Sequence, residues 1–152
     1  MRTALVRPNQ KVAGQPTMSF FFIEHTADMG MECRGASFEE LLDSAADGLY
    51  ALALRRTKRD TGIERAVEID ADGPEEMLVR WLQELIYLLE TDHFVAVERE
   101  FQTVSERSLA AVLKGHLCGP EDRAVEVKSA TYHDLEVRQE AGGYVARVTF
   151  DL

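Results

Sequence analysis

Apolar and polar residues alternate with two different periods along this chain, which separates predicted strands from predicted helices. Two segments, residues 38–54 and 74–91, repeat apolar residues at helical spacing. The segments that repeat them with the shorter period of a strand are residues 19–25, 29–35, 63–70, 94–105, 108–117, 124–139 and 144–152. This order predicts one α+β domain, a mostly antiparallel sheet with two packed helices.

The ends of the predicted helices carry specific signals. Ser37 followed by Glu40 is a capping-box pattern, which predicts a helix that begins at residue 38. Pro74 in a first turn, followed by two glutamates, predicts the start of the second helix. Gly142 and Gly143 separate the last two strands as a hairpin turn would. The local signals therefore agree with the apolar periods.

The length of 152 residues is that of one domain with a substantial core. Residues 1–18 show no apolar period, and we expect a disordered basic tail or a misassigned start codon before a domain at residues 19–152. The tail lacks the apolar region of a secretion signal and no run is long enough to span a membrane, so we expect a cytoplasmic protein. Cys33 and Cys118 lack Cys-x-x-Cys spacing and predict reduced thiols rather than a zinc site.

The charge of the chain restricts its partners. The formal net charge is −10, and the tail holds three basic residues and no acidic one, so residues 19–152 carry 14 basic residues against 27 acidic ones, a net charge of −13. Such a domain should repel a phosphate backbone, so we expect no strong direct binding of nucleic acid. A basic protein or a cation is the favoured partner.

Three groups of residues are candidates for chemistry, although common nucleotide-binding, zinc-protease and hydrolase motifs are absent. His25 and Asp28 flank a predicted strand connection, where a local hydrogen-bonding role is the simpler interpretation. Asp151 precedes Leu152, whose terminal carboxylate would lie close by and supply oxygen donors for a hard cation. Lys128 is either an exposed charge or a positive neighbour of these carboxylates. Convergence of Asp28 with Asp151 would require an offsetting cation or base.

Four motifs in order resemble the archease family. They are EHTADMG near the start, LVRWLQELIYLLETDHFV on the second predicted helix, VKSATYHDLEV, and VARVTFDL at the end. The resemblance extends over residues 19–152, and Met29 departs from the valine or isoleucine that is commoner in the family at this position.

The resemblance implies a small α+β protein that is not itself an enzyme. Archeases activate the GTP-dependent RNA ligase of tRNA splicing and RNA repair, by promoting guanylylation of the ligase histidine and multiple turnover. By resemblance, Asp28, Asp151 and Leu152 would hold a divalent cation, with calcium favoured over magnesium or manganese. Lys128 would contribute to activation, with His25 as an orienting neighbour.

Other functions are also compatible with the sequence. The family is linked to chaperone-like modulation of a tRNA methyltransferase. A general chaperone or structural adaptor, whose binding would depend on exposed apolar area, is a second hypothesis. A metal-dependent hydrolase that uses the two aspartates and His25 to activate water is the third hypothesis.

Overall fold

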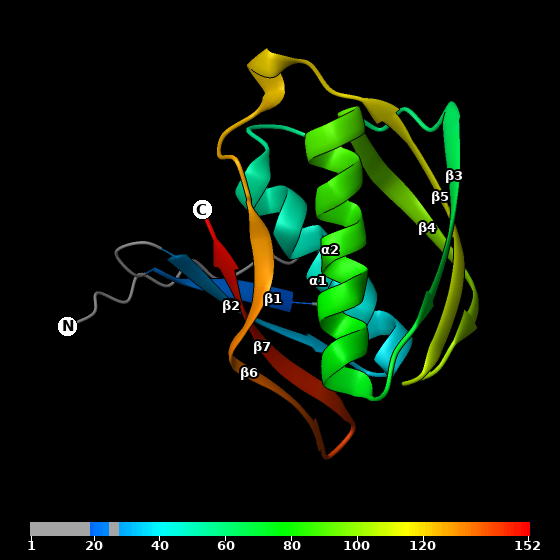
Figure 1. The fold of residues 1–152 in the computed structure, drawn as a ribbon, viewed down its shortest axis with the longest axis vertical. Coiled ribbons are helices and arrows are strands. Elements are labelled where there is room, and N and C mark those ends of the chain that lie inside the picture. Colours follow the sequence, from blue (N-terminus) through cyan, green and yellow to red (C-terminus); the bar gives the residue numbers. More distant parts are fainter. Residues whose placement is uncertain (1–18, 25–27) are drawn as a thin grey trace.

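The computed structural model describes residues 19–24 and 28–152. Seven strands, two α-helices and one short 3-10 helix succeed one another along this part of the chain (Figure 1). Their bounds are β1 Ser19–Glu24, β2 Asp28–Gly35, α1 Phe38–Ala53, β3 Ile63–Asp70, α2 Pro74–Asp92, β4 Phe94–Val104, β5 Ser108–Leu117, η1 Pro120–Asp122, β6 Ser129–Glu140 and β7 Gly143–Asp151.

The strands form two antiparallel sheets. One has the order β1-β2-β7-β6 and the other the order β3-β5-β4. The predicted α+β class and antiparallel pairing are confirmed, but the division into two sheets was not predicted. Periodicity identifies a strand, whereas the pairing of β2 with the distant β7 depends on tertiary packing.

Both helices lie between the two sheets, and each contacts strands of both (Figure 1). The predicted apolar stripes of α1 and α2 are buried, with Trp81 fully inside the core. The indole N–H of Trp81 donates a 2.8 Å hydrogen bond to the carbonyl of Leu42, which joins the two helices. Within the described part of the chain, no helix is long and apolar enough to cross a membrane.

The predicted helix and turn signals are confirmed by the hydrogen bonds. The Ser37 hydroxyl accepts a 3.1 Å bond from the backbone N–H of Glu40, while the Glu40 carboxylate accepts a 3.0 Å bond from Ala36. Pro74 is the first residue of α2. Gly142 has a φ of +83°, the left-handed conformation that suits glycine in a hairpin turn.

The strand predicted at residues 124–139 begins later, at Ser129, and ends at Glu140. The backbone before it pairs with other elements. The N–H groups of Ala124 and Val125 donate to the carbonyl of Ala53, and Val127 N–H donates to the Glu90 carboxylate. The alternation in this segment therefore reflects packing against the helix ends rather than strand pairing.

Candidate functional site

The register of the four-stranded sheet brings Asp28 and Asp151 together. Asp28 on β2 lies directly opposite Asp151 on β7, and Ser129 on β6 lies opposite Asp151 from the other side. Directly opposite residues point to the same face, with Cβ atoms about 4.5–5.5 Å apart. Because Met31 and Phe150 point into the core from these strands, the alternation places all three polar side chains on the outer face.

The two carboxylates differ in their surroundings. Asp28 Oδ1 is buried and has no hydrogen-bond partner among the described residues. Asp151 is exposed, and its Oδ2 lies 3.5 Å from the hydroxyl oxygen of Ser129. A buried acceptor without a donor is costly, because the lost hydration is not replaced. Two facing carboxylates, one of them with an orphaned oxygen, thus form a place where a positive charge would be stabilised.

The other candidate residues lie partly within this group. Lys128 precedes β6, and its backbone N–H donates a 2.9 Å bond to the carbonyl of Asp151, while its side chain is exposed. Leu152 follows Asp151, and its half-buried side chain packs on the core. His25 lies outside the described residues. The structure therefore brings Asp28, Asp151, Lys128 and Leu152 to the same end of the sheet.

The donor set fits a hard cation in type, because carboxylate oxygens are the ligands that calcium and magnesium prefer. The orphaned Asp28 oxygen is consistent with such a ligand role. Over residues 19–24 and 28–152, however, no three His, Cys, Asp or Glu side chains are placed to hold a metal ion. A cation here would thus need further donors beside Asp28 and Asp151, such as a main-chain carboxylate, water or a partner.

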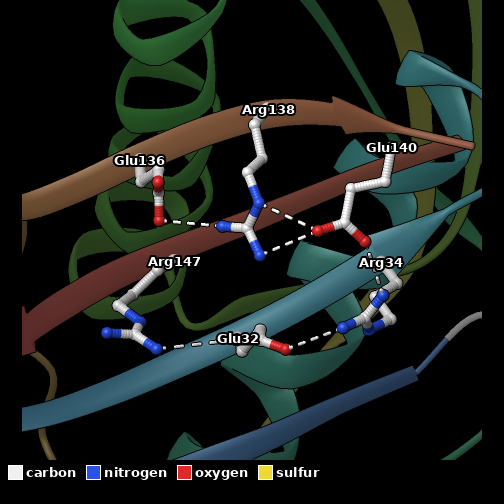
Figure 2. A network of polar contacts seen from close by, with 6 residues as sticks. All are labelled: Glu32, Arg34, Glu136, Arg138, Glu140 and Arg147. Carbon is white, nitrogen blue, oxygen red and sulfur yellow. Dashed lines mark hydrogen bonds and ion pairs between the residues drawn. The ribbon is translucent and has the colours of Figure 1, made fainter.

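The remainder of the same face carries a network of charges that was not predicted from the sequence. Figure 2 shows alternating acids and arginines that project from β2, β6 and β7. Contacts of 2.9 to 3.7 Å join them in the order Glu136, Arg138, Glu140, Arg34, Glu32 and Arg147. The alternation of charge along β6 was the available signal, but the partners on β2 and β7 depend on the register.

The two cysteines do not contribute to the site. Cys33 is buried, and desolvation raises the pKa of its thiol to about 12. Cys118 is half-buried, and burial also raises the pKa of its thiol. Neither forms a disulfide, which confirms the predicted free thiols and leaves the candidate site with oxygen donors.

The sequence profile of the Archease protein family (MTH1598/TM1083) matches residues 20–152, almost the whole described domain. The chain belongs to the archease family. An archease of Archaeoglobus fulgidus is 36% identical over 139 residues, which cover 89% of this chain and 100% of the relative. An archease of Methanosarcina mazei is 34% identical over 137 residues, which cover 86% of this chain and 94% of the relative.

Solved archease structures have the same fold. The solution structure of Methanobacterium thermoautotrophicum protein 1598 matches with a TM-score of 0.69 and 27% identity, over 88% of this chain and 98% of that protein. The crystal structure of a Thermotoga maritima archease, described as a possible chaperone, matches with a TM-score of 0.63 and 23% identity, over 86% of this chain and 94% of that protein. The second likeness shows the fold alone. Together they confirm the archease fold that the resemblance implied.

Proposed function

We propose that this protein is an accessory activator of the GTP-dependent RNA ligase that joins tRNA exon halves and repairs RNA ends. In this role it promotes guanylylation of the ligase histidine and multiple turnover, and is not itself an enzyme. The observation that carries the proposal is that Asp28 lies opposite Asp151 and that one oxygen of the Asp28 carboxylate is buried without a hydrogen-bond partner among the described residues. Membership of the archease family supports the same role.

In the proposed site, Asp28, Asp151 and the main-chain carboxylate of Leu152 hold a divalent cation, with calcium favoured over magnesium or manganese. When bound, the cation supplies positive charge beside the phosphates of the nucleotide. The chain itself positions the carboxylates through the register of β2 and β7. The hydroxyl of Ser129 lies beside Asp151, and the Lys128 side chain is free to reach a ligase carboxylate or a phosphate of GTP.

The charge of the domain is consistent with docking on a basic enzyme. Residues 19–152 carry a net charge of −13, which opposes binding of RNA by the protein alone. The same charge accelerates encounter with a positively charged RNA-binding enzyme at low ionic strength. Positioned charge around a phosphoryl group is also the main requirement of nucleotidyl transfer. The proposed partner therefore satisfies both the charge and the chemistry of the site.

The experiment that tests the proposal is single-turnover guanylylation of the cognate ligase with GTP and a divalent metal. Wild-type protein should accelerate formation of the guanylylated ligase, whereas Asp28→Ala and Asp151→Ala should leave the rate of the ligase alone. Glu136→Ala is the matched control, because it removes a carboxylate from the same outer face within the charge network. Full stimulation by both aspartate variants would overturn the proposal.

Chaperone-like modulation of a tRNA methyltransferase is the alternative, and the Thermotoga maritima relative is described as a possible chaperone. The large apolar side chains exposed in the described part of the chain are Tyr87, Leu117 and Tyr132. Three side chains do not make the extended apolar patch that general chaperone binding uses. Methyltransferase modulation that survives Asp28→Asn and Asp151→Asn would favour this alternative. Phosphodiesterase turnover by the protein alone would favour a hydrolase.

A further inference from the structure

Helix α2 exposes one polar stripe between the two sheets. Glu76, Arg80, Glu84 and Tyr87 recur at the spacing that keeps them on one side of the helix, while the other sides are buried. The helix lies between β3, an edge strand of one sheet, and β6, an edge strand of the other (Figure 1). Gln83 accepts a 2.8 Å bond from the backbone N–H of Ala130 on β6, which fixes the helix to that edge.

A groove follows the side of this stripe that faces β3. Its volume is about 460 Å³, and its lining combines β3 with the exposed side of α2. The lining residues are Glu68, Ile69, Asp70, Arg80, Gln83, Glu84 and Tyr87. Three of these are carboxylates and one is a cation, so the groove has an excess of negative charge.

The other side of the stripe is bordered by an irregular part of β6. The β6 and β7 register breaks between Thr131 and Glu136, and Asp134 within the break has a φ of 53°. Tyr132 lies in the same segment and is 60% exposed, two residues after Ala130, whose backbone N–H bonds to Gln83 of α2. Tyr87 is 57% exposed. Two of the three large apolar side chains exposed in the described residues thus lie on this stripe or on the strand beside it.

The acids of the groove have no partner within the described structure. Arg80 Nε contacts Glu76 Oε2 at 2.7 Å, so these two charges offset each other. Glu68, Asp70 and Glu84 form no ion pair with any other described residue. Carboxylates beside exposed tyrosine rings suit a guanidinium group, which pairs with the oxygens and packs over a ring. Tyrosine is also enriched among residues that dominate protein interfaces.

We propose that Glu84 and Tyr87 of the stripe, together with Asp70 of β3 and Tyr132 of β6 beside it, dock an arginine- or lysine-bearing segment of the partner ligase. The inference rests on the proposed function and adds a second contact to it. A second copy of the chain would bring a further net charge of −10 to an acidic surface. RNA would meet the same repulsion, so a basic protein segment is the occupant that the charges favour.

The stripe also adjoins the carboxylate pair around the edge of β6. This strand begins at Ser129, opposite Asp151, and continues through Ala130, which Gln83 of α2 contacts, to Tyr132. A ligase that contacts Asp28 and Asp151 on the outer face can therefore also contact α2 through a surface that continues along β6. The stripe would bind the ligase, and the two carboxylates would activate guanylylation of the ligase.

The test is calorimetric titration of the full-length ligase with the full chain, paired with guanylylation measured over a range of protein concentration. Combined Tyr87→Ala and Tyr132→Ala substitution, and separately Glu84→Lys, should each weaken binding at least about fivefold. Maximal stimulation should be recovered at high concentration, in contrast to Asp151→Ala. The matched controls are Leu117→Ala, an equally exposed apolar residue, and Glu39→Lys on exposed α1 surface, and both should bind as wild type. Thermal melting of each variant establishes that it is folded.

The outcomes separate this inference from the proposed function. If wild type binds and stimulates the ligase and the stripe variants titrate identically, the stripe is not the docking surface, although the activator role stands. If wild type neither binds nor stimulates, both fall. A dimer of the protein alone that dissociates in the tyrosine variant would identify a second copy as the occupant and overturn the inference. Binding of RNA that is lost in the same variant would also overturn it.

Discussion

The two ends of the outer face of the four-stranded sheet differ in how their charged side chains are paired. At one end, six acids and arginines alternate, and each arginine is in contact with at least one glutamate (Figure 2). At the other end, Asp28 faces Asp151 across the same two central strands. The first arrangement compensates its own charge, whereas the second leaves two like charges side by side.

The difference indicates which end the fold requires. Opposite charges across strands stabilise a sheet by about 0.2–1 kcal/mol per pair, and like charges directly opposite destabilise it. The network is therefore explained by folding alone. The aspartate pair is not, because a neutral residue at either position would serve the sheet better. Its cost makes sense if an external positive charge completes the site.

The largest expected effect is the response of stability to calcium. At a calcium concentration 100 times the Kd, binding would stabilise wild type by about 2.7 kcal/mol, which raises the Tm by about 5–10 °C in a domain of this size. Asp28→Asn should remove this shift, and Glu136→Gln should keep it, as measured by thermal melting with and without calcium. An equal shift in Asp28→Asn would place calcium elsewhere.

A smaller effect is expected from breaking the network. Arg138→Ala removes contacts to Glu136 and Glu140, whose side chains are 52% and 41% exposed. Exposed ion pairs contribute little, so the loss should be about 1 kcal/mol or less, as measured by urea denaturation. Since salt screens exposed charges, the loss should shrink further in 1 M sodium chloride. A loss of several kcal/mol would mean that the network is a major support of the fold.

The smallest effect has the opposite sign. In the presence of a chelator, Asp28→Asn should stabilise the protein by about 0.2–1 kcal/mol, because it removes the repulsion from Asp151. Urea denaturation at low ionic strength measures this gain. A marked loss of stability instead would show that the Asp28 charge is satisfied within the fold, and the contrast between the two ends would disappear.

The helices, strands and turns of the fold could be predicted from the sequence because the signals that determine them are local. The Ser37 cap, Pro74 and the glycines of the last hairpin act over a few residues, and the structure places each at the predicted position. The start of β6 was predicted too early because alternation alone cannot distinguish a paired strand from residues that bond to helix ends. Here Val127 N–H bonds to Glu90 rather than to a strand.

The candidate site could be predicted only in part, because its residues become neighbours through pairing of strands that are distant in the sequence. Motif resemblance selected Asp28 and Asp151, but only the register of β2 and β7 makes them neighbours. The partners of Arg138 and the position of Tyr132 on the part of β6 that follows its contact with α2 also depend on which strands lie together and where β6 departs from regular pairing. Whether the aspartates bind a cation stays a prediction.

The most direct test compares Asp151→Asn with Arg138→Ala in two assays, the free energy of unfolding in a chelator and guanylylation of the ligase with metal present. Asp151→Asn should be as stable as wild type or more stable, and should lose stimulation of the ligase. Arg138→Ala should be slightly less stable and should stimulate fully. An Asp151→Asn variant that is less stable than wild type and still stimulates the ligase would contradict a functional role for the aspartate pair.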